Sequence, residues 1–168
     1  DKRKKEWLAS RVLVYTLLKQ FTDVPAVLRK DQNGKPYFEN LPIHVSVSHS
    51  PALAAVIISD KYRVGIDIEL LSPKALRVAG KFLSQAEKTH TAQDESQTCL
   101  YWSAKETLYK LYSRKQLIFK DNLKLVPSPS QNMLEGQVIT ADFSKLYQIR
   151  YEFLPDHVLT YCIDDIQT

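Results

Sequence analysis

The feature that most constrains the fold of this chain is a short segment near its middle, V-G-I-D-I-E at residues 64–69. Alternate side chains of a β-strand point to the same face of the sheet, so alternating apolar and acidic residues are the pattern of a strand. The segment therefore predicts a strand whose valine and isoleucines face a core. Its other face would carry Asp67 and Glu69, and Gly65 would leave open space beside the two acids.

A second segment, about forty residues further on, predicts a helix that complements this strand. It reads W-S-A-K-E-T-L-Y-K at residues 102–110, and residues four apart share a face of a helix, so Glu106 and Lys110 are neighbours there. Alone, this pair is an ordinary surface ion pair, which stabilises a helix by roughly 0.2–0.5 kcal/mol. Together the two segments supply three carboxylates and an ammonium group. Such a set can hold Mg²⁺ against a phosphate ester, because Mg²⁺ prefers oxygen ligands and lysine is a common partner of phosphate.

The rest of the chain alternates between helical and strand patterns, which predicts an α+β fold. Helices are predicted over residues 4–20, after the N-cap Ser72 and Pro73, at the capping box Ser84–Glu87 and over residues 94–114. Strands are predicted near residues 43–48, 52–59, 64–69, 117–126, 136–142, 147–153 and 157–164. Asn33 and Gly34 mark a turn, and residues 21–29 are expected to be irregular or a short helix. We expect residues 52–59 and 64–69 to form a hairpin.

With these segments in place, the chain resembles the 4'-phosphopantetheinyl transferases. That family carries a V/I-G-I/V-D strand and a W/F-S/A/C-x-K-E-A/S/T-x-x-K helix, which match residues 64–67 and 102–110 in the right order. Glu69 adds the second acid of the D-x-E form, which resembles the larger, surfactin-synthetase-activating class. Two upstream elements of that class, G-K-P and S-H-S, match residues 34–36 and 48–50. The resemblance covers nearly the whole chain.

For the fold, the resemblance implies two similar α+β lobes packed as a pseudo-dimer, with the active site in the cleft between them. In this chain the lobes would span residues 1–63 and 64–168, and the second lobe would carry the metal site. A two-lobed chain builds the cleft internally, which implies a monomer. The larger class has a further strand region before its first helix, so we expect an N-terminal piece of the protein to be missing from this sequence.

The resemblance also implies roles for the acids and the lysines beside them. Asp67, Glu69 and Glu106 would hold Mg²⁺, which grips the pyrophosphate of coenzyme A. Lys110 would contact the phosphates and offset charge as the bond breaks. Lys105, next to the metal-binding glutamate, is a further candidate for contact with the coenzyme. Three acids without a cysteine or histidine among them argue against zinc.

At the nucleotide end of coenzyme A the resemblance implies a second group of contacts. Lys35, Ser48 and His49 would bind this end, including its 3'-phosphate. Lys5 falls near the position of a basic phosphate contact in the family, and Arg11 on the same predicted helix is the weaker candidate. A single histidine after a strand is more often structural, but the surrounding S-H-S element favours a functional role for His49.

The implied reaction transfers the phosphopantetheine arm to an acyl, polyketide or peptidyl carrier protein. A serine hydroxyl of the carrier attacks the β-phosphorus of coenzyme A, and adenosine 3',5'-bisphosphate leaves. Catalysis then rests mostly on positioning and on neutralising charge. Either Glu106 or a metal-bound water that it orients would take the serine proton, and the sequence does not choose between the two.

The charge of the chain suits this reaction but also allows another class of function. The formal net charge is +4 and the sequence pI is about 9.0, which suits a polyanionic coenzyme, an acidic partner protein or nucleic acid. The basic run at residues 2–5 is best interpreted as the solvated start of a helix, so no nucleic-acid partner is expected. A degenerate relative that binds coenzyme A without transfer is the other alternative. The intact set of acids and lysine argues against it.

The two cysteines carry no metal or disulfide pattern. Cys99 and Cys162 lie in a predicted helix and a predicted strand, without a CxxC or Cys/His cluster, so both are expected to be buried thiols. The sequence has no signal-peptide pattern and no apolar run long enough to span a membrane. We therefore expect a cytoplasmic protein without a membrane partner.

Overall fold

The computed structural model describes residues 1–114 and 116–165 and has the α+β fold that the sequence predicts. In chain order the elements are α1 (Lys2–Leu18), β1 (Leu28–Lys30), β2 (Pro36–Phe38), β3 (His44–His49), β4 (Ala54–Ser59), β5 (Val64–Leu70), α2 (Lys74–Phe82), α3 (Gln85–Thr91), α4 (Glu95–Tyr112), α5 (Phe119–Asn122), β6 (Leu123–Pro127), β7 (Met133–Ile139), β8 (Ser144–Phe153) and β9 (His157–Ile163). Among these described elements, no helix is both long enough and apolar enough to cross a membrane.

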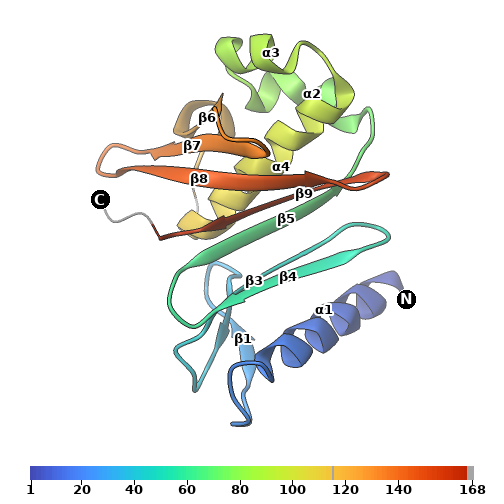
Figure 1. Cartoon of the computed structure of the whole chain (residues 1–168), viewed down its shortest axis with the longest axis vertical. Helices are drawn as coiled ribbons and strands as arrows, with labels where there is room; N and C mark the ends of the chain where they lie inside the picture. Colours follow the sequence, from blue (N-terminus) through green and yellow to red (C-terminus); the bar gives the residue numbers. More distant parts are fainter. Residues whose placement is uncertain (115, 166–168) are drawn as a thin grey trace.

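The strands form three antiparallel sheets. β1 pairs with β2, β3 pairs with β4, and a five-stranded sheet has the order β5-β9-β8-β7-β6. In Figure 1 the β3–β4 hairpin lies below β5, with α1 beneath it. The predicted hairpin between residues 52–59 and 64–69 is therefore wrong. β5 pairs instead with β9, from Val64 opposite Ile163 to Leu70 opposite His157, because the intervening turn carries the chain from one sheet to the next.

Helix α4 lies across the five-stranded sheet and has a defined cap at each end. The Asp94 carboxylate accepts the Gln97 N–H at 2.8 Å, and Ser113 ends the helix in the left-handed conformation at φ 52°. The Arg63 guanidinium donates to the carbonyl of Leu111. This contact ties the start of β5 to the last turn of α4, so the strand and helix that carry the two sequence motifs are fixed against each other.

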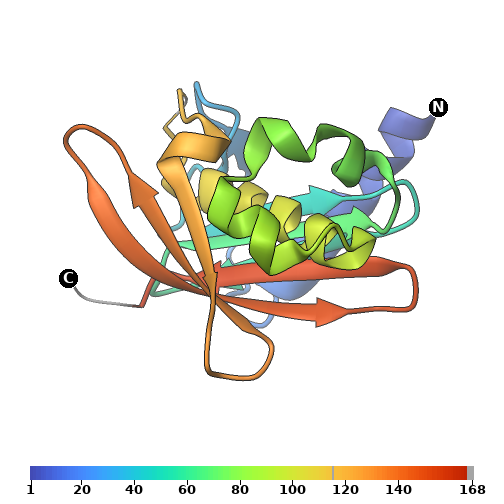
Figure 2. The same ribbon diagram turned by 90° about the horizontal axis from the view of Figure 1, so that it is seen from above.

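The larger hydrophobic core lies between this sheet and the helices, which gather on one of its faces in Figure 2. Its fully buried members include Leu100, Ala104, Leu108, Leu111, Leu123, Val138, Ile149 and Val158. Cys99 and Cys162 belong to the same core as free, buried thiols, as predicted. The helical spacing of the apolar residues of α4 explains why this face is buried.

Gly65 does not leave open space beside the acids, contrary to the expectation from the sequence. A Cβ atom at this position would lie 2.7 Å from the Thr107 carbonyl oxygen and 3.3 Å from the Cβ of Leu111. Both faces of β5 are therefore covered over most of its length, because α4 packs directly on the face that the alternation assigned to the acids. Glycine is needed here for the close approach of helix and strand.

A smaller core joins α1 to the first two sheets. It contains Val14, Leu18, Phe38 and Val45, all buried. The two cores lie on opposite sides of the junction between β3 and β5, which is where the chain brings its two sequence motifs together. The predicted helix at residues 4–20 is confirmed as α1, although it begins and ends two residues earlier.

Some local predictions need correction. Residues 21–29 include the start of strand β1, and residues 117–126 begin with the short helix α5 before β6. The N-cap of α2 is Pro73 rather than Ser72, whose hydroxyl accepts the Lys74 N–H at 3.4 Å. The capping box at the start of α3 is confirmed.

Candidate functional site

Asp67 lies at the centre of the candidate site, at the junction between β3 and β5. Its side chain is 4% exposed. One carboxylate oxygen, Oδ1, accepts hydrogen bonds from the Ser48 hydroxyl at 3.0 Å and the Lys110 ammonium at 2.9 Å. The other oxygen, Oδ2, is buried without a hydrogen-bond partner within the described residues. Because buried polar atoms are nearly always satisfied, this oxygen has a free position for a ligand.

The charge of Asp67 acts on two further carboxylates, those of Glu69 and Glu106. Burial, followed by the charge of Asp67, raises the pKa of Glu69 to about 7, although the Trp102 indole N–H donates to it at 3.1 Å. Burial and the charge of Asp67 also raise the pKa of Glu106 to about 7, against the opposing effect of Lys110. Three acids held this close repel one another when ionised, so the site favours a cation.

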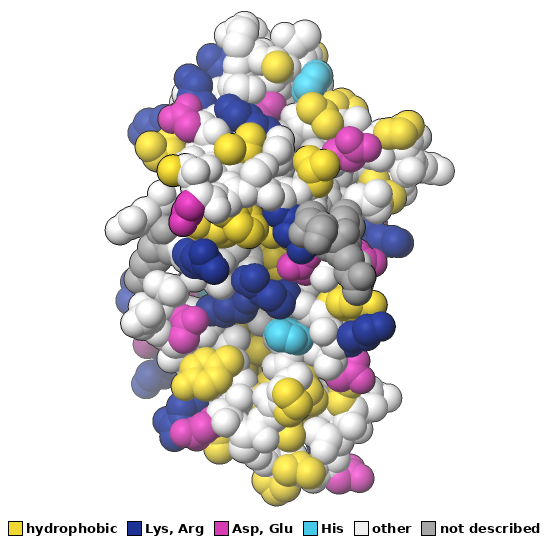
Figure 3. Space-filling view, turned by 90° about the vertical axis from the view of Figure 1, so that its left-hand side faces the viewer, with side chains coloured by type: hydrophobic (Ala, Val, Ile, Leu, Met, Phe, Trp, Pro, Cys, Tyr) yellow, Lys and Arg dark blue, Asp and Glu magenta, His cyan; other side chains and the backbone are white. Residues whose placement is uncertain are grey.

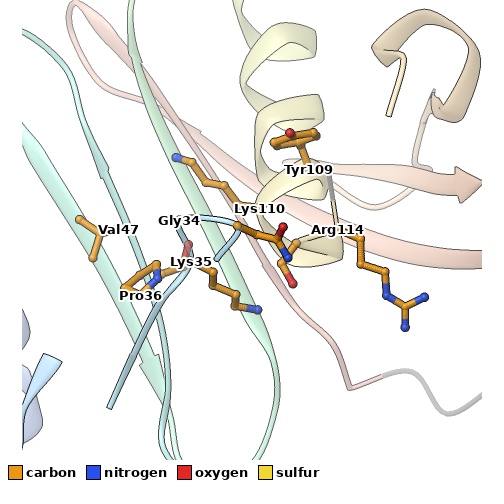
Figure 4. A pocket seen from close by; sticks show the side chains of 10 residues that line it. Gly34, Lys35, Pro36, Val47, Tyr109, Lys110 and Arg114 are labelled. Carbon is orange, nitrogen blue, oxygen red and sulfur yellow. The ribbon is translucent and has the colours of Figure 1, made fainter. Parts of the chain in front are cut away.

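Lys110 supplies a positive charge next to these acids. Its ammonium donates to the backbone carbonyl of Ile66 at 3.0 Å as well as to Asp67. The same side chain lines a cavity of about 140 Å³ between α4 and the turn before β2. The lining residues are Asn33, Gly34, Lys35, Pro36, Ser46, Val47, Tyr109, Lys110, Ser113 and Arg114. Figure 4 shows Gly34, Lys35 and Pro36 on one side of this cavity and Tyr109 and Lys110 of α4 on the other.

The turn that carries Lys35 is built by local hydrogen bonds. The Asp31 carboxylate accepts the backbone N–H groups of Asn33 and Lys35 at 2.8 and 2.9 Å, and Gly34 adopts φ +82°, a conformation that glycine favours. The predicted turn is thus confirmed. Burial and the charge of Arg63 lower the pKa of Lys35, so an anion bound here would restore the favourable environment for its ammonium group.

A second cavity of about 420 Å³ adjoins the first and shares Gly34, Pro36 and Val47 with it. The remaining lining residues are Arg3, Glu6, Trp7, Ser10, Arg11, Val14, Leu28, Arg29, Lys30 and His49. Elsewhere on the surface, Lys and Arg side chains also gather at half-height of the face shown in Figure 3. This second cavity combines several cations with the exposed aromatic ring of Trp7, which the Arg11 guanidinium covers at 4.4 Å.

The S-H-S element divides between the acids and the second cavity. Ser48 is buried and turned toward the acids, since its hydroxyl donates to Asp67 and accepts the Ile68 N–H at 3.2 Å. His49 is exposed and lines the second cavity, where its Nδ1 lies 3.8 Å from a carboxylate oxygen of Glu6. The two neighbours therefore lie on opposite faces of β3, as expected for consecutive residues of a strand.

The structure does not bring Lys105 to the site. Its side chain is 0% exposed, and its ammonium donates to the Phe82 carbonyl at 2.7 Å, to the Glu87 carboxylate at 2.8 Å and to the Phe119 carbonyl at 2.9 Å. These three acceptors use all the hydrogens of the ammonium group. On a helix, adjacent residues point about 100° apart, so Lys105 faces the core behind the site while Glu106 faces the acids.

The basic residues of α1 in the second cavity differ from the one that the sequence singled out. Lys5 is exposed and does not line either cavity described above, whereas Arg3 and Arg11 line the second cavity. Arg3, Trp7 and Arg11 are spaced by four residues, so helical periodicity could have placed them on one face. Lys30 comes from β1, and only the fold brings it to the same cavity.

The acids do not form a ready-made cage for a metal ion. Among residues 1–114 and 116–165, no group of three or more His, Cys, Asp or Glu side chains is arranged so that it could hold an ion by itself. Mg²⁺ does not require such a cage, because it is commonly bound by one or two carboxylates together with substrate phosphates and waters. The free oxygen of Asp67 and the raised pKa values of Glu69 and Glu106 fit that mode of binding.

Comparison with known proteins gives family matches for both parts of the chain. Residues 63–162 match the model of the 4'-phosphopantetheinyl transferase superfamily, and residues 1–59 match the 4'-phosphopantetheinyl transferase N-terminal domain. The 4'-phosphopantetheinyl transferase AcpT of Salmonella typhimurium is 30% identical over 123 residues, which are 70% of this chain and 58% of that protein. Sfp of Bacillus subtilis is 29% identical over 139 residues, which are 77% of this chain and 59% of Sfp. The aligned part of the chain thus spans less than two thirds of the length of these relatives.

Proposed function

Since this chain belongs to the 4'-phosphopantetheinyl transferase superfamily, we propose that it transfers the 4'-phosphopantetheine arm of coenzyme A to a serine of an apo carrier protein. Adenosine 3',5'-bisphosphate is the second product. The observation that carries this proposal is the meeting of Asp67, Glu106 and Lys110, because the Lys110 side chain also lines a cavity with two further cations. That arrangement suits a reaction in which charge on phosphate must be neutralised.

We propose that the two cavities divide the coenzyme between them. The pyrophosphate lies in the smaller cavity, which Lys35 lines from the turn before β2 and Lys110 lines from α4. The nucleotide end lies in the larger cavity, where His49 and Arg11 supply donors for the 3'-phosphate. Guanidinium groups suit phosphate because they offer several donors in a fixed plane. Arg114, at the edge of the smaller cavity, is a further cation for the phosphates or for an acidic carrier.

We propose Mg²⁺ as the cation of the site, held by Asp67, Glu69 and Glu106 together with oxygens of the coenzyme. When bound, the ion would draw negative charge from the phosphate oxygens. The carboxylates favour a hard cation over zinc, since all three are oxygen ligands and Cys or His ligands are absent from this set. Burial, followed by the charge of Asp67, raises the pKa values of Glu69 and Glu106, and a bound cation would offset that charge.

Glu106 and Lys110 are the residues that we assign to the chemistry. Glu106 receives the proton of the carrier serine, either directly or through a water that it orients. Lys110 is fixed by Ile66 and Asp67 at the cavity wall. It therefore meets the charge that develops on the phosphate oxygens without first having to be ordered.

We also propose that residues 1–63 and 64–168 are two lobes of one monomer, with the site at their junction. Support comes from the separate sheets of the two parts and from a separate hydrophobic core in each. Residues on both sides of the junction line the smaller cavity, which includes Ser46 from the first part and Lys110 from the second. A second copy of the chain is therefore not required to complete this cavity.

The test is to incubate the protein with coenzyme A, Mg²⁺ and an apo carrier protein, and to weigh the carrier by intact mass spectrometry. Acyl, polyketide and peptidyl carriers are tried in parallel, because all present a serine. The expected result is the gain of one phosphopantetheine, which chelator prevents and Mg²⁺ restores. Coenzyme binding without any transfer to these carriers would favour a degenerate coenzyme-binding protein.

Substitutions assign the activity to the proposed residues. Asp67→Ala and Glu106→Ala should abolish transfer with the fold retained, and Lys110→Ala should lower kcat more than it weakens coenzyme binding. Glu135→Gln, on an exposed position of β7, is the matched control and should leave transfer unchanged. Near-normal turnover in either alanine variant of an acid would overturn the metal assignment.

A further inference from the structure

Serine side chains, rather than backbone hydrogen bonds, join β3 to the five-stranded sheet. β3 and β5 belong to different sheets, and alternate positions of the first carry Ser46, Ser48 and, just past its end, Ser50. The Ser46 hydroxyl accepts the Ile66 N–H at 3.2 Å, and the Ser48 hydroxyl accepts the Ile68 N–H at 3.2 Å. These contacts fix the register between the two parts of the chain along the candidate site.

The third serine takes part in a different contact that the proposed function does not use. The Ser50 Oγ lies 2.7 Å from Nε2 of His157, and Nδ1 of the same ring lies 2.7 Å from the Asp156 carboxylate. Ser50 and His157 are 6% and 1% exposed. We call this hydrogen-bonded chain of Ser50, His157 and Asp156 the latch. It connects the turn after β3 to the first residue of β9.

The hydrogen bonds around the latch indicate the direction of each contact. The Ser50 Oγ accepts the backbone N–H groups of Ala52 at 3.3 Å and Leu53 at 3.0 Å. Both lone pairs of the hydroxyl are then used, so its hydrogen is donated to Nε2 of His157. An ionised carboxylate can only accept, so the ring donates its Nδ1 hydrogen to Asp156.

A Ser-His-Asp chain is also the arrangement of many hydrolases, but this one does not have the features that hydrolysis needs. The two nearby N–H groups point at the Ser50 oxygen itself, whereas an oxyanion hole must point at an oxygen of the substrate. The hydroxyl is buried, and Ser50 does not line any of the cavities described above. The latch is therefore a connection between elements.

Through β9, the latch ties the end of β3, which carries His49, to the neighbouring strand β5, which carries the proposed metal contacts. Ser50 directly follows His49, and His157 pairs with Leu70, the residue after Glu69. The Asp156 carbonyl also accepts the Leu71 N–H at 2.9 Å, so the His157 side of the latch is anchored to the end of β5. Holding Ser50 there restricts the movement of His49 relative to the acids.

We propose that His157 is a positioning residue: through Ser50 it holds the end of β3 so that His49 meets the 3'-phosphate of coenzyme A. The inference rests on the proposed function, because it assumes that coenzyme A binds in the two cavities. It adds a residue about a hundred positions from the S-H-S element to the recognition of the nucleotide end. Loss of the latch should weaken recognition of the 3'-phosphate more than binding of the rest of the coenzyme.

The test compares coenzyme A with dephospho-coenzyme A, which lacks only the 3'-phosphate, by calorimetry in the presence of Mg²⁺ and without a carrier. The unsubstituted protein should bind coenzyme A more tightly. In Ser50→Ala that preference should fall by about threefold to tenfold, the effect expected when one hydrogen bond that fixes a side chain is lost. The affinity for dephospho-coenzyme A should stay the same. Asp156→Ala, at an exposed carboxylate, should show a smaller loss with the fold retained.

Two controls separate positioning from stability. Ser103→Ala removes another buried hydroxyl contact to β9, the one with Thr160 at 2.8 Å, and should lower stability without changing the preference for coenzyme A. Ser50→Thr keeps the hydroxyl and should restore most of the preference. If Ser50→Ala and Asp156→Ala both keep the full preference for coenzyme A over dephospho-coenzyme A, the proposed positioning role of the latch is wrong. If the unsubstituted protein binds coenzyme A and dephospho-coenzyme A equally well, the His49 assignment is wrong as well. Transfer to a carrier is tested separately, by the mass of the carrier.

Discussion

Replacing Glu106 with glutamine should make the ion-free protein more stable at neutral pH while it removes transfer activity. Burial and the charge of Asp67 raise the pKa of Glu106 from 4.5 to about 7, and Lys110 opposes this effect only in part. An ionised carboxylate at this position therefore opposes folding. Glutamine keeps the shape of the side chain without the charge, so Glu106→Gln isolates the electrostatic contribution.

The magnitude follows from the pKa of the folded and unfolded states. A tenfold change in proton affinity corresponds to about 1.4 kcal/mol, so above pH 7 the variant should gain about 1 to 3 kcal/mol in free energy of unfolding. The lower value allows for the partial exposure of Glu106, because water screens its charge. The gain should decrease as the pH falls from 7 toward 4.5, because at low pH the carboxyl is protonated in both states.

The assay is urea unfolding in the presence of chelator, followed by tryptophan fluorescence at pH 8 and pH 5. Glu135→Gln makes the same chemical change on an exposed position of β7, and it should shift the free energy of unfolding by less than about 0.5 kcal/mol. A Glu106→Gln variant that is no more stable than its parent at pH 8 would refute the reasoning. An equal gain at both pH values would refute it too, since the effect would then not depend on the charge.

Three further predictions concern the structure around the site. Lys105→Met should destabilise the fold by about 3–5 kcal/mol in urea unfolding, because it leaves the buried Glu87 carboxylate without its ion pair; an unchanged stability with weaker coenzyme binding would contradict the structural role. Gly65→Ala should cost about 1–3 kcal/mol, since its Cβ would lie 2.7 Å from the Thr107 carbonyl oxygen, whereas Gly80→Ala, with nothing within 4 Å, should be neutral or slightly stabilising in the same measurement. Added Mg²⁺ should raise the melting temperature of the parent protein more than that of Glu106→Gln. Equal increases in melting temperature would contradict Mg²⁺ binding at Asp67, Glu69 and Glu106.

The acids and the lysine of the candidate site could be predicted from the sequence because they lie within two regular elements, β5 and α4. Alternation along β5 and the four-residue spacing on α4 are local properties, and they identified Asp67, Glu106 and Lys110. Periodicity alone failed for Lys105, which the sequence could not distinguish from Glu106. Whether an adjacent residue on a helix faces the site or the core depends on what packs against each face.

Other parts of the arrangement depend on contacts between distant segments. The pairing of β5 with β9 joins residues about ninety positions apart, and the nearest strand in the sequence, β4, was the wrong partner. Lys30 reaches the larger cavity only because the fold brings β1 to α1, where the Leu28 N–H donates to the Tyr15 hydroxyl at 3.3 Å. His157 lies beside Ser50 only because β9 runs next to β5. No local pattern in the sequence carries this information.

The sequence by itself determined the α+β class, most of the helices and strands, and the acidic and basic residues available for phosphate chemistry, because the periodicity and capping that specify them act over a few residues. The tertiary structure decided which faces of β5 are covered, why Gly65 must be glycine, where Lys105 points and how Ser50 meets His157. These features arise from the packing of α4 and β9 on β5. Such packing depends on residues that are far apart in the sequence and come into contact only in the folded chain.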